Sequence, residues 1–335
     1  MSQTLLEIKN LKVHFPVQTS SFKKATQHVR AVDDINLSVN QGETLGVVGE
    51  SGCGKSTLAR TIIGLEKPTA GQILFEGIDL NQLNAKDMRE VRRHIQMIFQ
   101  DPLTSLNPRM KVGEIIAAPL KAYKVKTNIP SRVKELMDLV GLHPDEHYDR
   151  LPHEFSGGQR QRIGIARAIA IEPKLLICDE PVSALDVSVQ AQVINLLEDL
   201  QKALGLTYIF IAHDLSVVKH IADQIAVMYL GKIMELSNKN NFYKHAQHPY
   251  TNALLSAIPL PDPIQEQKRQ QVVLEGELPS PIDPPTGCVF HTRCPFAQDA
   301  CRENVPYLKK ADEQTDHYIA CFYPQRQQNI AITKK

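Results

Sequence analysis

The segment GESGCGKST, residues 49–57, lies between an apolar run, Leu45-Gly46-Val47-Val48, and the helical pattern TLARTIIGL. It fits G-x-x-x-x-G-K-[ST] in the strand-to-helix context in which that pattern binds nucleotide phosphates. Glycines let the backbone turn tightly and point its amide groups inward, where the start of the following helix attracts anions. A glycine-rich turn with a surface lysine is the alternative, but the flanking pattern favours a phosphate-binding loop.

The residues of this loop have separate expected tasks. Lys55 would place a point charge at the β and γ phosphates of a nucleotide, and the Ser56 hydroxyl would ligate Mg²⁺. Cys53 is most simply interpreted as a small side chain that fills space in the loop. The tight turn itself is assigned to Gly49, Gly52 and Gly54.

Further apolar runs, Leu175–Cys178 and Tyr208–Ala212, read as buried parallel strands followed by helical patterns, which predicts an α/β core. LEIKNLKVHF, INLSV and QILFEG alternate apolar and polar residues, which predicts an antiparallel β lobe. Helical patterns between about residues 105 and 160 indicate a helical insertion, and repeated prolines from about residue 258 indicate a linker followed by a small C-terminal domain.

Polar residues follow three of the expected strands. In LLICDE, Asp179 is expected to hold Mg²⁺ and Glu180 to polarise the attacking water. His213 follows YIFIA and would lie at the same sheet edge near the γ phosphate, and Gln100 follows IQMIF and could orient the water or ligate Mg²⁺. Each of these four residues alone could be a polar residue at a solvent-exposed strand end, so the prediction of a catalytic site rests on all four together.

The segment FSGGQRQRIGIARAIA, residues 155–170, predicts a second helix start that attracts anions, with Ser156 and two glycines before a helix that begins near Gln159. Because the first loop already wraps one nucleotide, this second site is most useful if it reaches the γ phosphate of a nucleotide on another subunit. A capped helix without a ligand is the alternative.

The bulk composition restricts the function further. Lys plus Arg number 38 against 37 Asp plus Glu, so a net charge of +1 supplies no broad field for nucleic acid or anionic lipid. The start MSQTLLEIKN is not a signal peptide, and no apolar run is long enough to span a membrane, so we expect a cytosolic chain that can dock on a membrane protein.

Taken in order, these motifs resemble those of the ABC-type ATPases: a Walker A loop, the Q-loop glutamine Gln100, the FSGGQ signature, a Walker B strand, the D-loop SALD at residues 183–186, and the switch histidine His213. QMIFQDPLTSLNPR, HPYTNALLSAIP and GELPSPIDPPTGCVFHTRCP resemble the oligopeptide and dipeptide importer branch of that family. The resemblance covers nearly the whole chain.

The resemblance implies a P-loop NTPase fold with a RecA-like core, an ABC ATPase domain over residues 1–257 and a C-terminal domain over residues 258–335. It implies ATP hydrolysis coupled to import of oligopeptides or dipeptides. The nucleotide-binding residues would include the following: Glu50, Ser51, Cys53, Thr57, Ser156, Gly157, Gly158, Gln159 and Asp186.

The implied partners are a second homologous ATPase subunit, two membrane permease subunits and an extracytoplasmic peptide-binding protein, with this chain peripheral on the cytoplasmic face of the cell membrane. Phe99 and Leu103, after or beside Gln100, would contact the permease. The family's adenine-stacking aromatic is missing from TQHVRAVDDI, which leaves Phe15 or Phe22 as candidates.

Other functions stay open at this stage. A soluble ABC ATPase acting on ribosomes or DNA would be expected to carry two ATPase modules or a long coiled coil, and a metabolite kinase would leave FSGGQ and SALD unused. Import of another solute by the same branch is a further alternative.

Four of the six cysteines, Cys288, Cys294, Cys301 and Cys321, lie in the last 48 residues, and their spacing differs from paired C-x-x-C zinc motifs. They could supply a [4Fe–4S] cluster, bind zinc, or remain free thiols. The resemblance favours the cluster, because members of the peptide-importer branch carry one here.

Overall fold

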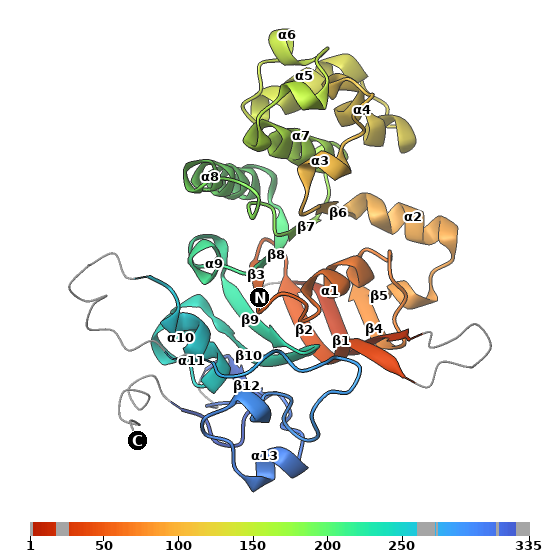
Figure 1. The fold of residues 1–335 in the computed structure, drawn as a ribbon. Helices are drawn as coiled ribbons and strands as arrows, with labels where there is room; N and C mark the ends of the chain where they lie inside the picture. Colours follow the sequence, from red (N-terminus) through yellow and green to blue (C-terminus); the bar gives the residue numbers. More distant parts are fainter. Residues whose placement is uncertain (1–2, 18–26, 260–271, 273, 313–314, 326–335) are drawn as a thin grey trace. The chain divides into compact units, whose positions relative to one another are not determined.

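The computed structural model describes residues 3–17, 27–259, 272, 274–312 and 315–325. The chain forms two compact units (Figure 1), the first from residues 1–5, 39–44 and 82–212 and the second from residues 6–38, 45–81 and 213–335. Each unit is described by itself.

The first unit contains three parallel strands, β6 (Ile95–Ile98), β7 (Leu175–Asp179) and β8 (Thr207–Ala212), with β7 in the middle. Every residue of β7 and β8 is buried, as expected for parallel strands covered on both faces. The register pairs Ile98 with Cys178 and Asp179 with Ile211, so the carboxyl ends of these strands lie at one edge.

The helices of the first unit gather mainly beyond β6 (Figure 1). The apolar faces of α4 and α7 hold this group together, because α4 packs on both α5 and α7. The helical elements are α2 (Ala85–His94), α3 (Pro102–Ser105), α4 (Val112–Ala122), α5 (Ile129–Leu139), α6 (Pro144–His147), the 3₁₀ turn η2 (Pro152–Glu154), α7 (Gly157–Ile169) and α8 (Val187–Leu204).

The second unit holds a sheet in the order β2 (His28–Asn40), β1 (Thr4–Pro16), β4 (Ala70–Phe75), β5 (Ile78–Asp79). Strand β1 runs antiparallel to β4, with Leu6 opposite Phe75, and alternates buried and exposed residues. The predicted α/β core with an antiparallel β lobe is therefore confirmed.

A second set of strands in this unit joins the early chain to its C-terminal part. β3 (Thr44–Val48) pairs in parallel with β9 (Gln224–Tyr229), which pairs antiparallel with β10 (Lys232–Asn238). The short strands β12 (His317–Ile319) and β11 (Lys309–Lys310) continue this order. The helical elements are α1 (Lys55–Ile62), η1 (Leu80–Gln82), α9 (Leu215–Ile221), α10 (Lys239–His245), α11 (Pro249–Ser256), η3 (His291–Arg293) and α13 (Asp299–Glu303).

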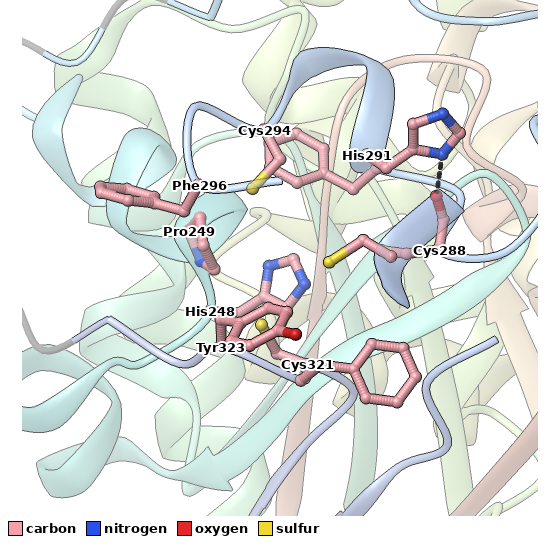
Figure 2. Close-up of a pocket in the computed structure, with 11 residues that line it drawn as sticks. His248, Pro249, Cys288, His291, Cys294, Phe296, Cys321 and Tyr323 are labelled. Carbon is pink, nitrogen blue, oxygen red and sulfur yellow. Dashed lines mark hydrogen bonds between the residues drawn. The ribbon is translucent and has the colours of Figure 1, made fainter. Parts of the chain in front are cut away.

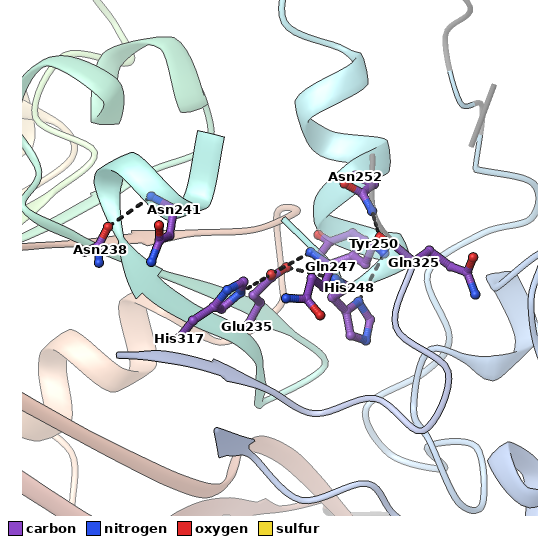
Figure 3. A network of polar contacts seen from close by, with 9 residues as sticks. All are labelled: Glu235, Asn238, Asn241, Gln247, His248, Tyr250, Asn252, His317 and Gln325. Atoms are coloured by element: carbon purple, nitrogen blue, oxygen red, sulfur yellow. Dashed lines mark hydrogen bonds and ion pairs between the residues drawn. The ribbon is translucent and has the colours of Figure 1, made fainter. Parts of the chain in front are cut away.

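A buried carboxylate fastens the C-terminal segment to β10 (Figure 3). Glu235, which is 0% exposed, lies 2.6 Å from Nε2 of His317 and accepts hydrogen bonds from the backbone amides of Gln247 and His248 at 2.8 and 3.1 Å. Burying a carboxylate is costly unless its oxygens are paired, and here three donors from two segments pair them.

Within the described residues, no helix has both the length and the apolar character needed to span a bilayer.

Glu235→Ala should destabilise the chain by about 2–5 kcal/mol, because it leaves His317 and two buried amides without their acceptor. Urea unfolding followed by circular dichroism measures this loss. Asp316→Ala is the matched control, since Asp316 is 80% exposed in its ion pair with Lys310 and should leave the midpoint unchanged. Equal effects of the two substitutions would contradict the role given to Glu235.

Candidate functional site

The loop of residues 49–54 joins β3 to α1 and has the conformation that the glycine pattern predicts. Gly54 has φ 106° and Gly49 has φ 154°, values that other residues rarely adopt. A Cβ on Gly54 would collide with the carbonyl of Ala31, and one on Gly49 with the carbonyl of Met228. The surrounding backbone therefore leaves no room for side chains at these two positions.

Lys55 opens α1 and is only 4% exposed. Its ammonium donates hydrogen bonds to the carbonyl oxygens of Gly49 and Glu50 at 2.7 and 3.0 Å. Within the described residues these carbonyl dipoles hold the cation, while the Glu50 carboxylate pairs elsewhere. A buried cation beside a helix start whose cap lacks a side-chain acceptor attracts an anion.

The buried side chain of Cys53 packs in the same loop, as the filler interpretation expected. Ser56 and Thr57 occupy the first turn of α1, and Ser51 and Gly52 are exposed at the loop surface.

In the first unit, two predicted catalytic residues meet at the ends of neighbouring strands. Nε2 of Gln100, after β6, donates to Oε2 of Glu180, after β7, at 2.8 Å. Glu180 has φ 47°, an unusual value for a glutamate, and it follows Asp179, which is 2% exposed. The parallel pairing of β6 and β7 thus brings an amide and a carboxylate to one edge, as the sequence predicted.

His213 follows β8 and is exposed. The next residue, Asp214, caps α9 by accepting the amide of Ser216 at 2.7 Å. His213 therefore lies between a strand end and a helix start, the kind of position expected for it.

The FSGGQ segment forms the start of α7. Ser156 caps this helix: its Oγ accepts the Gln159 amide at 3.3 Å, and its own amide donates to Oε1 of Gln159 at 3.0 Å. The helix begins at Gly157, two residues earlier than the expected start near Gln159. Ser156 and Gly157 are exposed, and Gly158 is buried against Val189, so the helix start is accessible on one side.

Asp186 caps α8 by accepting the Val189 amide at 3.0 Å. Hydrogen bonds from Ser188 and from this amide lower the pKa of its carboxyl, which is therefore ionised at neutral pH. The neighbouring residue Val187, at the start of α8, is apolar and yet 82% exposed to solvent.

The aromatic candidates are placed only in part. Phe15 lies in β1 and is half-buried, and Phe22 falls outside the described residues. Phe99 is 37% exposed, in keeping with a contact surface, whereas the structure does not describe the side chain of Leu103.

The four C-terminal cysteines line one pocket (Figure 2) together with His248, His291 and aromatic side chains. They form no disulfide. Burial raises the pKa of Cys294 to about 11 and that of Cys321 to about 12, so these thiols are protonated at neutral pH unless a cation joins them. Among the described side chains, no group of three or more His, Cys, Asp or Glu residues is arranged to hold a metal ion.

The cysteine segment folds on itself through backbone contacts. The amide of Cys288 donates to the carbonyl of Cys301 at 2.8 Å, and Gly287, at φ 67°, lies against the backbone of Cys301 and Arg302. Phe290, 1% exposed, packs on the rings of Tyr229 and Tyr250 at centroid distances of 5.2 and 5.3 Å. A small aromatic core thus supports the pocket.

Two residues at the phosphate loop were not expected from sequence. Arg293 pairs with the Glu50 carboxylate, and the Tyr250 hydroxyl accepts the Glu50 amide at 3.0 Å. Neither has a local sequence signal, since Arg293 is 243 residues and Tyr250 is 200 residues away from Glu50 in the chain.

Comparison with known families and proteins agrees with these motifs. Residues 32–183 match the ABC transporter family, and residues 234–301 match the family described as oligopeptide/dipeptide transporter, C-terminal region. The chain is 54% identical to the oligopeptide transport ATP-binding protein AppF of Bacillus subtilis over 322 residues, 95% of this chain and 97% of the relative. It is 56% identical to the oligopeptide transport ATP-binding protein OppF of Salmonella typhimurium over 324 residues, 95% of this chain and 96% of the relative.

A solved structure, a dimeric ATP-binding cassette in a post-hydrolysis state bound to ADP and Pi, matches with a TM-score of 0.62 and 27% identity. The match covers 70% of this chain and 99% of that one.

Gly54→Ala should abolish high-affinity ATP binding, because its Cβ would meet the Ala31 carbonyl at a φ that alanine avoids. Gly164→Ala in α7 is the matched control, since a Cβ there meets nothing within 4 Å and alanine favours a helix. Equilibrium ATP binding to each full-length variant measures the effect. Wild-type affinity in folded Gly54→Ala would contradict the role of this loop.

Proposed function

The chain belongs to the ATP-binding subunits of ABC transporters, in the oligopeptide/dipeptide branch, and we propose that it hydrolyses ATP to drive import of peptides by a membrane complex. The buried Lys55 ammonium, held by carbonyl oxygens in a glycine loop at a helix start, carries this proposal. The match over residues 234–301 favours peptide transport over a metabolite kinase or a soluble ABC ATPase. In this proposal residues 1–257 form the ATPase domain, with its helical part at about 105–160, and residues 258–335 form the C-terminal domain.

The phosphate loop binds the nucleotide in this account. The loop of residues 49–57, with Gly49, Glu50, Ser51, Gly52, Cys53, Gly54 and Thr57, surrounds the phosphates, and Lys55 turns its ammonium from the loop carbonyls to the phosphate oxygens. The Lys55 ammonium is already removed from water in the folded chain, so it loses little hydration when it meets a phosphate. The loop is therefore preorganised for its ligand.

Hydrolysis is assigned to the strand-end residues. Ser56, Asp179 and Gln100 offer the oxygen ligands that Mg²⁺ prefers, and bound Mg²⁺ would neutralise charge on the phosphates. Glu180 orients and polarises the attacking water, and Gln100 helps to orient the carboxylate by donating a hydrogen bond to its Oε2 at 2.8 Å. His213 would donate to the γ phosphate.

The serine-led start of α7 is assigned to ATP held by a second ATPase subunit. Ser156 and Gly157 are exposed, so Ser156, Gly157, Gly158 and Gln159 can meet a phosphate from outside the chain. Asp186 and the exposed Val187 would line the contact between the two subunits. Two solved structures that this chain resembles are dimers of an ATP-binding cassette, which supports a sandwich of this kind.

The complete assembly would contain a second homologous ATPase, two permease subunits and an extracytoplasmic peptide-binding protein. This chain would lie on the cytoplasmic face of the membrane as a peripheral subunit, with Phe99 and the region after Gln100 against the permease. Binding of ATP would close the ATPase pair and rearrange the permease, and hydrolysis would reset it.

Glu180→Gln should retain ATP binding and lower turnover by about a hundredfold or more, since the amide keeps the shape but cannot polarise water. Steady-state ATPase activity of the assembled transporter measures this. Asp199→Asn, an exposed acid on α8, is the control and should hydrolyse ATP normally. Near wild-type turnover by Glu180→Gln would refute its assignment.

We also propose that Cys288, Cys294, Cys301 and Cys321 hold a [4Fe–4S] cluster. Their convergence on one pocket supports this, because the four side chains come from separate segments of the C-terminal chain. A cluster would crosslink a domain that has few apolar residues of its own.

Anaerobically purified protein should be brown and contain about four irons per chain. Cys294→Ser should lose most of this iron and the broad visible absorbance, whereas Cys178→Ala, in the buried strand β7, should keep both. Colourless, iron-free wild-type protein from anaerobic cells would overturn the cluster proposal.

A further inference from the structure

The segment that carries the cysteines contacts the phosphate loop through one charged pair. Nη1 of Arg293 lies 3.0 and 2.9 Å from the two carboxylate oxygens of Glu50. The Arg293 side chain is 9% exposed and the Glu50 side chain 28%, so water screens this pair less than a surface ion pair.

Both the side chain and the backbone of Glu50 are fixed by the C-terminal part of the chain. Its amide donates to the Tyr250 hydroxyl at 3.0 Å, and its carbonyl accepts from Lys55 at the same distance. The guanidinium of Arg293 lies 5.9 Å from the centroid of the Tyr229 ring, which also contacts Tyr250 at 4.8 Å. Arg293, Tyr250 and Lys55 thus hold Glu50 through its carboxylate, its amide and its carbonyl, respectively.

The negative charge of Glu50 explains why it needs a cationic partner such as Arg293. A carboxylate in a loop that binds triphosphate repels the ligand, and the repulsion is strong where water is largely excluded. Arg293 neutralises the carboxylate and holds it against the C-terminal segment.

Arg293 ends η3 and directly precedes Cys294, one of the residues lining the thiol pocket (Figure 2). Phe290, which starts this turn, packs on Tyr229 and Tyr250. The position of Arg293 therefore depends on how the pocket segment is folded.

We propose that Arg293 is a positioning residue of the ATP site: by neutralising and orienting Glu50, it makes ATP affinity depend on the cysteine-bearing C-terminal segment. This inference rests on the proposed function, because it concerns the affinity of the same loop for ATP.

Arg293→Met keeps an unbranched side chain but removes the guanidinium and its charge. It should weaken MgATP binding to the full-length chain by about tenfold or more, raise KM in the assembled transporter in parallel, and leave kcat within about twofold. Glu50→Gln alone removes the carboxylate and serves as the reference for the double variant.

The decisive variant combines the two substitutions. Adding Glu50→Gln to Arg293→Met should bring MgATP affinity to within about threefold of the single Glu50→Gln variant, since the unpaired carboxylate is the cause of the loss. A merely structural role of Arg293 would not be rescued in this way. Arg132→Met, which breaks exposed pairs with Glu135 and Glu172, is the matched control and should not change affinity.

Wild-type affinity in folded Arg293→Met, or a loss that persists undiminished in the double variant, would overturn the inference. A fall in kcat at unchanged KM would also overturn it, because it would place Arg293 at another step. Absence of MgATP binding by the wild-type chain would instead contradict the proposed function itself.

Discussion

The constraint on which the site depends is the burial of one ammonium group inside a backbone turn. Lys55 is nearly inaccessible, and the carbonyl oxygens of Gly49 and Glu50 hold its charge. Such a cation is tolerable only where dipoles or an anion compensate it, and the loop can curve around it only because Gly49 and Gly54 have no side chain. The same geometry that makes the lysine costly for folding makes the loop selective for phosphate.

The C-terminal segment is joined to the rest of the second unit by polar contacts as well as by the aromatic packing of Phe290. Glu235 holds His317 and the start of α11 together, and Arg293 pairs with Glu50. Removing one partner of a buried ion pair leaves the other charge unpaired in the interior, which is strongly unfavourable. Both contacts therefore connect the thiol pocket to the rest of the second unit in one defined geometry.

Much of the site followed from local sequence patterns. The apolar runs before GESGCGKST and after Pro173 became β3 and β7, and the ends of parallel strands brought Gln100 to Glu180. Such residues are predictable because a strand direction and a sheet edge fix where the next side chain lies. The roles assigned to these residues in ATP hydrolysis remain predictions.

Long-range partners could not be predicted in this way. Arg293 and Tyr250 reach Glu50 only through the complete fold, and Glu235, in an alternating strand, reads from sequence as a solvated acid. The start of α7 at Gly157 differed from the expected Gln159 because the Ser156 cap already orders the intervening glycines. Spacing alone also gave no reason for four cysteines to share one pocket.

The proposed arrangement places ATP between the glycine loop of one subunit and the serine-led helix start of its partner. Its most direct test is a structure of the assembled transporter with ATP trapped before hydrolysis. The account predicts Ser156 within hydrogen-bond distance, about 3 Å, of a γ phosphate held by the partner subunit. If the Ser156 region is remote from every phosphate in that assembly, the account is wrong.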